Sequence, residues 1–542
     1  MGEQRIRIGA VADVPKNGMK AFTFTGQDDD ATQVLISNLD GKLYATSAKC
    51  SEFCFTLTGN RLRPDTRNLA AHYGAPLANG VLTSSGRCVC PWHGAAFDVK
   101  SGDIEDAPGL DGILSLKLEV EGSDIHVTAD PEKLKGKPGN APGCAAPQIK
   151  SQGSGLVIVG GGAGAIHTIE SARKSGYAER ITVLSREPHV PIDRTKLSKG
   201  LITDHKAVQW RNKAHLENVL HVDFRQSARV ISIDVEAKKV NVEGGDALSY
   251  DALVLATGGT PRRLPVDGAK EGQLGNVFTL RGLEDTNAIV SALGDKADKN
   301  LVVIGSSFIG CEGAIAAAGQ EKAKSVSVVG MEEVPFERVL GSEVGAGLRT
   351  AAEKNNGVKF YMKSGVSRLE GDGGKVKCVV IKDESGKEVS LPADVVILGV
   401  GVAPATEWAK DSKGFPDLQK DGSVEVDVDF RVKGIAKDAN VFAIGDIATY
   451  PTRDGKATTR IEHWNVASNH GRHVGHALAK PNLAPPQFDK LPVFWSALGS
   501  QLRYVSDGNG PGFDGVHLDG SPEELKFAAF YYKGDSITAV AT

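Results

Sequence analysis

The sequence predicts a multidomain chain in which an all-β domain precedes a larger α/β region and a small C-terminal α+β domain. Residues 1–130 contain short strand-like and turn-like segments with no long helical period. Residues 131–153 are rich in Pro, Gly, Lys and Ala, a composition typical of a flexible linker. From Gly155 onward apolar strands alternate with helical stretches, and this alternation predicts parallel sheets covered by helices.

Composition and charge limit the possible classes of function. The chain has 542 residues, of which 41% are hydrophobic, and these values allow several domains with large buried cores. The formal net charge is −4 and there is no basic run, so we expect neither a nucleic-acid partner nor an anionic membrane surface. The residue pattern does not indicate an oligomeric state.

Cysteine use and the N-terminal residues bear on the cellular compartment. The seven unevenly spaced cysteines do not suggest a disulfide framework and favour a reducing environment. The N-terminus lacks an apolar signal core and an Arg/Ser-rich transit pattern, and no apolar run is long enough to span a bilayer. We therefore expect a cytoplasmic protein without a transmembrane segment, and association with mitochondria stays open.

The all-β region contains two short segments that combine cysteine and histidine. Cys90–His93 reads C-x-x-H, and His72 begins the upstream stretch His72–Leu77. In a Rieske [2Fe–2S] centre two thiolates hold one iron and two imidazoles hold the other. We therefore predict a Rieske cluster whose ligands are Cys50, His72, Cys90 and His93.

Two other interpretations of these residues exist. Two cysteines and two histidines can also bind zinc tetrahedrally, and buried free cysteines beside an incidental histidine need no metal at all. Gly/Pro-rich loops follow both ligand pairs, and Phe97-Asp98 and Gly102 lie where a Rieske domain would have them. This context favours the iron–sulfur cluster.

The first half of the motif is interrupted. It should read C-x-H, but Ala70 stands where the cysteine is expected, and the nearest upstream cysteines are Cys54 and Cys50. Twenty-one residues, 51–71, separate Cys50 from His72 where the motif needs one. Removing this segment and restoring one residue gives Cys50-x-His72.

Two explanations of residues 51–71 stay open. The codons for Ser51-Glu52 can contain a splice donor and those for Ala70-Ala71 an acceptor, so the segment can be a retained intron. Splicing would then leave a threonine between Cys50 and His72. Alternatively it is a real surface insertion, because long loop insertions cost little closure entropy. A real insertion would have to fold back to present one of the two upstream cysteines.

The first α/β segment contains a dinucleotide-binding pattern. A buried apolar strand, Leu156–Val159, leads into the sequence G-x-G-x-x-A. Gly160 permits the tight turn, Gly162 allows close approach of a pyrophosphate, and Ala165 allows close packing of helix on strand. Glu187 follows the next predicted strand, where an acid can bind a ribose. The alternative is a glycine-rich turn in an unrelated sheet.

A second, weaker copy of this pattern follows the strand Leu301–Ile304. Gly305 and Gly310 keep the first and third glycine positions, whereas Ser307 replaces the second glycine. The strand after it ends at Glu332, and an acid at that point favours the 2′-hydroxyl of NAD over the 2′-phosphate of NADP.

An arginine near this acid would accommodate the 2′-phosphate of NADP. The nearest arginine after Glu332 is Arg338, six residues further along the chain, so the sequence favours NADH over NADPH.

Further motifs place the chain in a family. The Gly160 loop, an Ala256-Thr257-Gly258 turn, the Gly305 loop and a Gly445-Asp446 strand end follow one another in this order. Together they resemble the FAD-containing pyridine-nucleotide oxidoreductases. The stretch 191–199 narrows the resemblance to the branch of apoptosis-inducing factor and the ferredoxin reductases. With its N-terminal Rieske motif the chain resembles the apoptosis-inducing factor 3-like proteins.

The resemblance implies a division of the chain into domains. We expect a Rieske domain at 1–130, a linker at 131–153, an FAD-binding domain at 154–275 and 395–480, an NAD-binding domain at 276–394 and a C-terminal domain at 481–542. The last domain is expected to be truncated, because a predicted strand pair in 527–542 stands where a closing helix is expected.

The same resemblance implies roles for individual residues. Lys199 and Glu312 match a catalytic pair beside the flavin ring, and residues 462–464 match positions near that ring. For Trp464 and Trp495 core packing is an alternative. The expected FAD ligands are Gly160, Gly162, Ala165, Glu187, Arg194, Lys199, Ala256, Thr257, Gly258, Asp446 and Trp495. The expected NAD ligands are Gly305, Gly310 and Glu332.

The expected function is electron transfer. NADH would deliver two electrons as hydride to FAD, and FAD would pass them singly to the [2Fe–2S] cluster and on to an unknown acceptor. No cysteine lies between Gly160 and Lys199, so we do not expect a dithiol mechanism. The alternative is a signalling flavoprotein like apoptosis-inducing factor, which would favour a basic surface that the net charge does not suggest.

Overall fold

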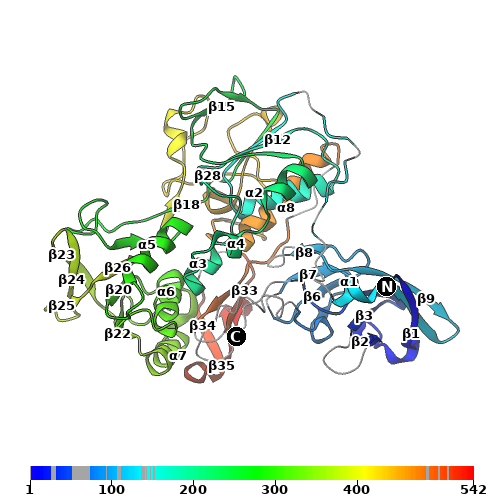
Figure 1. Cartoon of the computed structure of the whole chain (residues 1–542), viewed down its shortest axis with the longest axis horizontal. Helices are drawn as coiled ribbons and strands as arrows, with labels where there is room; N and C mark the ends of the chain where they lie inside the picture. Colours follow the sequence, from blue (N-terminus) through cyan, green and yellow to red (C-terminus); the bar gives the residue numbers. More distant parts are fainter. Residues whose placement is uncertain are drawn as a thin grey trace. The chain divides into compact units, whose positions relative to one another are not determined.

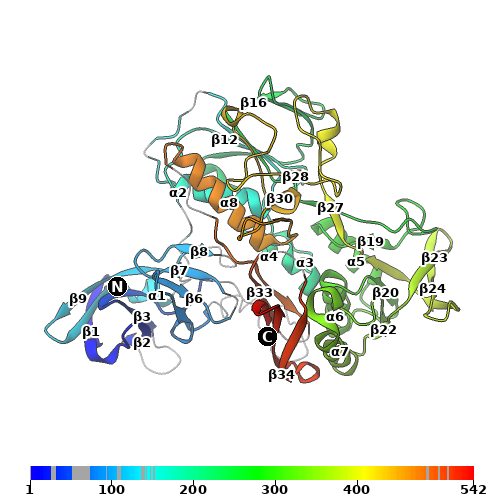
Figure 2. The same cartoon turned by 180° about the vertical axis from the view of Figure 1, so that it is seen from behind.

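The chain forms two compact units, residues 1–143 and 144–542 (Figures 1 and 2). No helix among the described residues is long and apolar enough to cross a membrane. A computed structural model describes residues 2–25, 32–51, 74–92, 94–106, 111–135, 141, 143–146, 148–150, 153–483, 488–498, 501–509 and 512–542.

The first unit contains an antiparallel sheet of six strands. Its inward-facing side chains alternate along the strands, as Ile125, Val127 and Ala129 do in β10, and bury one core with Phe24 and Val34. In spatial order the strands are β1 (Gln4–Ala10), β10 (Asp124–Ala129), β9 (Ser115–Glu121), β4 (Lys42–Ser47), β3 (Thr32–Leu39) and β2 (Gly18–Thr25).

A smaller antiparallel sheet of the same unit holds the predicted metal-binding segments. Its own core combines apolar residues such as Leu77 and Phe97 with three cysteines, Cys50, Cys88 and Cys90. Its strands are β5 (Val81–Leu82), β6 (Arg87–Val89), β7 (Ala96–Asp98) and β8 (Ile104–Asp106). The short helices of the unit are η1 (Val11–Asp13), η3 (Leu77–Asn79) and α1 (Pro131–Lys135).

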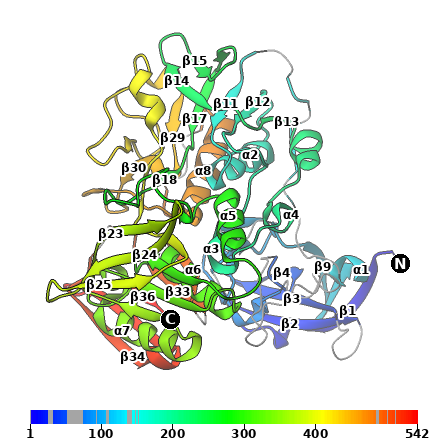
Figure 3. The ribbon, with the colours of Figure 1, turned by 60° about the vertical axis from the view of Figure 1, so that its left-hand side comes forward.

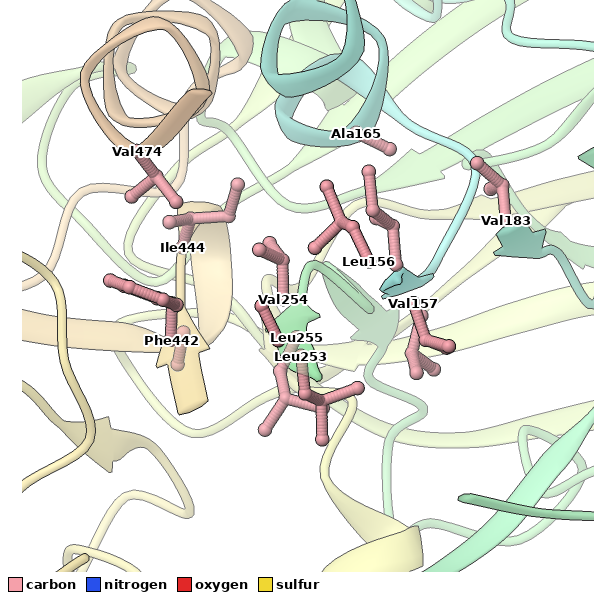
Figure 4. Close-up of a cluster of buried hydrophobic side chains, with 14 of the residues drawn as sticks. Leu156, Val157, Ala165, Val183, Leu253, Val254, Leu255, Phe442, Ile444 and Val474 are labelled. Carbon is pink, nitrogen blue, oxygen red and sulfur yellow. The ribbon is translucent and has the colours of Figure 1, made fainter. Parts of the chain in front are cut away.

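The second unit begins with a parallel sheet of five strands. Four-residue strands of purely apolar or near-apolar sequence, such as Leu156–Val159, are buried on both faces, as a parallel sheet between helices requires. The order is β13 (Val222–Arg225), β12 (Ile181–Leu184), β11 (Leu156–Val159), β17 (Ala252–Leu255) and β29 (Val441–Ala443). Figure 4 shows Leu253, Val254 and Leu255 of β17 among side chains of the neighbouring strands, such as Leu156 of β11 and Phe442 of β29.

Two helices, α2 (Ala163–Lys174) and α8 (Trp464–Ala479), lie side by side against this sheet (Figures 1 and 2). Glycines make the approach possible. A Cβ on Gly471 or Gly475 would come within 2.4 Å of a main-chain oxygen of α2. Helices distant in sequence are thereby held at backbone contact.

A second parallel sheet repeats this plan. It is covered by α5 (Leu283–Leu293), α6 (Phe308–Gly319) and α7 (Glu337–Asn356). Its strands, in order, are β19 (Val277–Thr279), β26 (Val395–Leu398), β20 (Asn300–Ile304), β21 (Ser325–Val329) and β22 (Lys359–Tyr361).

Small sheets of two or three short strands complete the unit. These are β14 (Val230–Asp234), β15 (Lys239–Val242) and β16 (Leu248–Ser249); β18 (Gly259–Pro261) and β27 (Val402–Pro404); β23 (Gly365–Asp372), β24 (Lys375–Lys382) and β25 (Glu388–Pro392); and β28 (Val424–Glu425), β30 (Ala448–Pro451) and β31 (Thr458–Thr459). Their strands pair antiparallel except for β28 with β30, which are parallel. The short helices are α3 (Thr195–Gly200), α4 (His205–Val208), η4 (His215–Val219), η5 (Glu407–Asp411), η6 (Lys437–Ala439) and η7 (Gly445–Ile447).

The C-terminal residues form an antiparallel sheet that packs on α7 (Figure 3). The Tyr531 hydroxyl donates a hydrogen bond to the main-chain oxygen of Leu340 in that helix, at 3.0 Å. The strand pair expected in 527–542 is present. The order is β32 (Val493–Ala497), β33 (Gln501–Ser506), β36 (Ser536–Ala541), β35 (Lys526–Lys533) and β34 (Gly515–Ser521), with η8 (Pro522–Glu524) before β35.

A buried arginine ties the end of α2 to the sheet. Arg173 is fully buried and donates to the main-chain oxygens of Leu220, Tyr177, Glu179 and His221, at 2.6–3.1 Å. These residues directly precede β12 and β13, so one guanidinium fixes where both strands begin. Its planar fork of donors suits this role better than a lysine ammonium would.

We predict that Arg173→Met destabilises the second unit by about 3 kcal/mol, because it leaves several buried carbonyls without donors. Arg173→Lys should recover only part of this loss. Urea unfolding followed by tryptophan fluorescence measures the effect, with Lys354→Met at an exposed position of α7 as the control. Equal unfolding midpoints for Arg173→Met and the control would contradict the assigned role.

Candidate functional site

The first glycine loop joins β11 to α2 at the carboxyl edge of its sheet. Gly160 has φ +111°, and a Cβ there would lie 2.2 Å from the main-chain oxygen of Ala256, so only glycine fits. A Cβ on Gly162, the N-cap of α2, would meet nothing within 4 Å. Ala165 is fully buried where the helix meets the strand. The open space at an uncapped helix N-terminus fits a pyrophosphate.

Glu187 and Arg194 form an ion pair beyond β12. The Arg194 Nη2 atom donates to both carboxylate oxygens of Glu187 at 2.6 Å, and its Nη1 donates to the main-chain oxygen of Arg281 at 3.1 Å. Burial by itself would raise the pKa of Glu187, but the adjacent Arg194 guanidinium lowers it below its usual value. The carboxylate therefore stays ionised as an acceptor for ribose hydroxyls.

The Gly445-Asp446 turn follows β29 and faces the Ala256–Gly258 turn after β17. Arg281 donates to Asp446 Oδ2 at 2.7 Å, and a Cβ on Gly258 would lie 3.2 Å from Arg281 Nη2. The Thr257 hydroxyl donates to the main-chain oxygen of Ala405, which fixes the turn. Sequence reasoning missed Arg281, because no motif surrounds it.

His470 of α8 supports the same turn from inside the protein. The Gly445 N–H donates to His470 Nδ1 at 3.2 Å, so this nitrogen holds the lone pair and Nε2 holds the proton. The imidazole is fully buried, with its centroid 4.2 Å from that of Phe430 and 4.6 Å from that of Tyr450. Burial, with a smaller contribution from His473, lowers the pKa of His470 to about 3.

Lys199 and Glu312 meet between the two nucleotide folds. The Lys199 Nζ atom of α3 lies 2.9 Å from Glu312 Oε1 of α6, and the side chains are 13% and 4% exposed. The two residues are far apart in sequence, so only the tertiary structure joins them. Hydroxyls of Ser198 and Ser496 donate to the same carboxylate.

The aromatic residues expected near the flavin surround this pair. The Lys199 ammonium lies 4.9 Å from the centre of the Trp495 ring, a cation–π contact. Burial, together with the Lys199 charge, lowers the pKa of His463 to about 3. Trp464 packs against Trp210 with ring centres 6.1 Å apart, so core packing accounts for its contact. Glu462 accepts instead from Arg460 at 2.6 Å, away from the pair.

The second glycine loop joins β20 to α6 in the same way as the first. Gly305 has φ +113°, and a Cβ there would lie 2.2 Å from the main-chain oxygen of Gly399. A Cβ on Gly310 would lie 2.2 Å from the Gly305 oxygen, so the third position also requires glycine. Ser307, the substituted position, is exposed at the N-cap of α6 with extended φ −93° and needs no glycine.

Glu332 lies beyond β21 beside this loop. Ser306 Oγ donates to its Oε2 at 3.0 Å, and the exposed Arg338 places Nη2 3.3 Å from its Oε1. The expectation that no arginine adjoins Glu332 is therefore wrong, because the chain turns back over the loop and the Phe336 N–H bonds the Ser306 oxygen. A preference for NADH thus depends on the carboxylate itself, which is 26% exposed.

The loop after β6 has a defined geometry around Cys90. Its N–H donates to the main-chain oxygen of Ala95 at 2.7 Å, and its own oxygen accepts from Gly94 N–H at 3.2 Å. Gly94 has φ +80°, a backbone conformation that glycine permits. His93 lies outside the described residues, as do His72 and Cys54.

Cys50 makes the same kind of main-chain hydrogen bond as Cys90. Its N–H donates to the main-chain oxygen of Ala75 at 3.0 Å, and Lys49 pairs with Pro76 in an antiparallel bridge. Gly74 has φ +125° at the position corresponding to Gly94. The residues on either side of 52–73 are therefore already paired with each other.

The two loops become equivalent when 51–71 is replaced by one residue. Cys50 would then lie five positions before Ala75, as Cys90 lies five before Ala95, and each cysteine N–H would bond that alanine oxygen. Both thiols are buried in the same cluster of side chains. Thiols in this arrangement suit the thiolate-bound iron of a Rieske cluster.

These features define a class of protein: a reductase with two dinucleotide folds, joined to a domain with Rieske-type loops. Comparison with known proteins agrees. The Pyridine nucleotide-disulphide oxidoreductase family matches residues 154–471, and the Rieske [2Fe-2S] domain matches residues 66–117. The chain therefore belongs to the pyridine nucleotide-disulphide oxidoreductase family, and it is an FAD-dependent NAD(P)H oxidoreductase fused to a Rieske domain.

Individual relatives support this conclusion. Apoptosis-inducing factor 3 of Homo sapiens is 39% identical over 482 residues, which cover 87% of this chain and 74% of the relative. The biphenyl dioxygenase system ferredoxin–NAD(+) reductase component of Paraburkholderia xenovorans is 31% identical over 362 residues, or 66% of this chain and 82% of the relative.

A solved structure agrees with the fold. The ferredoxin reductase for the CYP199A2 system from Rhodopseudomonas palustris superimposes with a TM-score of 0.64 at 29% identity, covering 72% of this chain and 91% of that one. The resemblance to apoptosis-inducing factor 3-like proteins and the expected fold class are confirmed.

We predict that the free energy of unfolding decreases as the pH is lowered from about 6.5 to 5. His463 and His470 stay neutral in the fold, whereas in the unfolded chain they take up protons below about 6.5. Their contribution is complete above that pH and declines as the pH drops toward their folded-state pKa of about 3. Urea midpoints at pH 8, 6.5 and 5 test this.

His470→Asn should make this pH dependence less steep, because it removes one of several histidines whose pKa the fold lowers, while keeping an acceptor near Gly445. The exposed His517→Asn serves as the control and should leave the slope unchanged. A His470→Asn protein with the wild-type slope would contradict the buried, neutral imidazole.

Proposed function

We propose that this reductase carries electrons from NADH, through FAD bound at the Gly160 loop, to a [2Fe–2S] cluster in the first unit and then to a separate redox partner. The observation that carries the proposal is the Lys199–Glu312 pair. Lys199 follows the first glycine loop in the chain, on helix α3, which packs against α6, and Glu312 lies in α6, the helix that follows the second glycine loop. A nucleotide on each loop would bring its ring toward the place where the two folds touch.

Different residues would bind different parts of FAD: a helix N-terminus the pyrophosphate, and carboxylates the hydroxyl groups. The N-terminus of α2 and the space over Gly162 receive the pyrophosphate. Glu187, kept ionised by Arg194, accepts ribose hydroxyls. Asp446, oriented by Arg281, accepts from the ribityl chain. FAD, when bound, supplies the change from two-electron hydride chemistry to one-electron transfer.

In the second fold, the N-terminus of α6 and Glu332 would receive NADH. Ser306 donates a hydrogen bond to one oxygen of Glu332. The other oxygen contacts Arg338, and it would accept a hydrogen bond from a ribose hydroxyl in place of this contact when NADH binds. Lys199 keeps a positive charge beside the reacting rings, and Glu312 balances it. Cys50 and Cys90 would hold one iron of the cluster, and His72 and His93 the other.

The electron acceptor is inferred only by class. Relatives include a ferredoxin–NAD(+) reductase component, which supports a redox protein as partner. The six described cysteines form no disulfide, in keeping with a reducing compartment such as the cytoplasm, and an association with mitochondria stays compatible. A signalling role remains the second candidate, and the net charge of −4 speaks against nucleic acid as its target.

We predict that the purified protein is yellow and that, without oxygen, NADH bleaches its flavin band faster than NADPH does. Glu332→Ala should raise the NADH concentration needed for half-maximal reduction about tenfold while FAD stays bound, because charge-assisted hydrogen bonds to ribose are lost. Stopped-flow absorbance measures both. Glu333→Ala, at the neighbouring exposed carboxylate, is the control. Equal rates with NADH and NADPH would overturn the role of Glu332.

We predict that the shortened chain, with Cys50-Thr-His72 in place of Cys50 to His72, assembles the cluster. The loop joining Cys50 to Ala75 would then have the same length as the loop joining Cys90 to Ala95, a hairpin of ordinary size. Reduction should give a Rieske-type EPR signal that the 542-residue chain lacks.

Ligand variants of the shortened chain make this test specific. Changing Cys50, His72, Cys90 or His93 to alanine should each remove the signal, whereas Cys88→Ala should keep it. Cys88 lies within β6, and its Sγ faces the main-chain oxygen of Leu77 at 4.0 Å, so it is not expected to be a ligand. A strong Rieske signal from the 542-residue chain would instead make 51–71 a real insertion.

A further inference from the structure

Two consecutive residues of the C-terminal sheet contact the two members of the Lys199–Glu312 pair. In β32 the Trp495 ring lies 4.9 Å from Lys199 Nζ. The next residue, Ser496, is 1% exposed and donates from Oγ to Glu312 Oε1 at 2.5 Å. The C-terminal sheet therefore contacts both charged residues of the Lys199–Glu312 pair.

The Glu312 carboxylate has three donors from two other parts of the fold. Oε1 accepts from Lys199 and Ser496, and Oε2 accepts from Ser198 Oγ at 2.5 Å. Lys199 and Ser198 come from α3, and Ser496 comes from β32. A carboxylate this deeply buried remains ionised only when its oxygens are hydrogen-bonded.

The other titratable neighbours add no charge. Burial raises the pKa of Cys311, next to Glu312 in α6, far above its usual value, so it stays a thiol. His463 stays neutral, because burial and Lys199 lower its pKa to about 3. Beyond Lys199, the donors that support the Glu312 charge among these contacts are therefore the two serine hydroxyls.

We propose that Ser496, together with Ser198, is a positioning residue that holds the Glu312 carboxylate in place beside Lys199, and so sets how the Lys199–Glu312 pair is presented to the flavin. The inference rests on the proposed function, in which this pair adjoins the flavin ring. In this proposal the C-terminal sheet contributes a residue to the redox site, in addition to packing on α7.

The loss of one serine hydroxyl should change the flavin midpoint potential and the rate of flavin reduction in a predictable direction. A Glu312 carboxylate with one donor fewer is held less firmly beside Lys199, and the Lys199 charge is then less balanced. A less balanced cation stabilises the reduced, more negative flavin, so its midpoint potential should rise. A loosened pair should also orient the reacting groups less well, so reduction should slow despite the higher potential.

The experiment compares Ser496→Ala, Ser198→Ala and Ser496→Thr in the full chain loaded with FAD. Each alanine variant should raise the flavin midpoint potential and slow reduction by saturating NADH roughly tenfold, the scale of one charge-assisted hydrogen bond. Ser496→Thr keeps the hydroxyl and should restore both values. Ser506→Ala, in the neighbouring strand β33, is the control and should change neither.

A double-mutant cycle with Glu312→Gln tests whether the serines act through this carboxylate. In that background Ser496→Ala should add almost nothing, because residues that act as one unit are not additive. Full additivity, or an unchanged potential and rate in both alanine variants, would overturn the inference. Thermal unfolding of the apoproteins serves as the check on folding, and the two serines provide independent variants.

The outcomes separate this inference from the proposed function. If Glu312→Gln itself reduces flavin at the wild-type rate, the pair has no role at the ring and the proposed function fails with it. If Glu312→Gln slows reduction but neither serine variant changes potential or rate, only the serine assignment fails.

Discussion

Two close contacts between main-chain atoms set the geometry of the reductase unit. Gly160 and Gly305 each have φ above +110°, and a Cβ at either position would lie 2.2 Å from the oxygen of a neighbouring strand end. A side chain at either place would push the strand and its helix apart. Because the chain turns this tightly, α2 and α6 begin at the carboxyl edges of their sheets, and neither N-terminus has a side-chain cap. The phosphate sites that we propose at both folds depend on this constraint.

Hydrogen bonds and ion pairs then orient the carboxylate that follows each nucleotide-binding loop. Arg194 keeps Glu187 ionised beside the first fold, and Ser306 orients Glu332 beside the second. The pair Lys199–Glu312 lies between the folds and is also contacted from the C-terminal sheet. A charge in such a setting needs its partner, since removing one member leaves the other desolvated and unbalanced.

In the first unit the residues that flank 52–73 keep a defined framework. Cys50 bonds Ala75 as Cys90 bonds Ala95, and positive-φ glycines precede both alanines. Because these contacts pair the residues flanking 52–73, the framework needs only a short loop to close. The same local hydrogen bond therefore occurs at both cysteines that we propose as ligands, even though one motif is interrupted in the sequence.

The sequence by itself determined the local features: the strand-to-helix glycine loops, the acid after each second strand, and the cysteine motif at Cys90. These depend on neighbouring residues, so periodicity and spacing reveal them. Only the tertiary structure decided which distant side chains meet. It placed Arg281 on Asp446, Arg338 on Glu332 and Ser496 on Glu312. No sequence pattern encodes such contacts, because they arise where separately folded segments pack and leave buried charges that require partners.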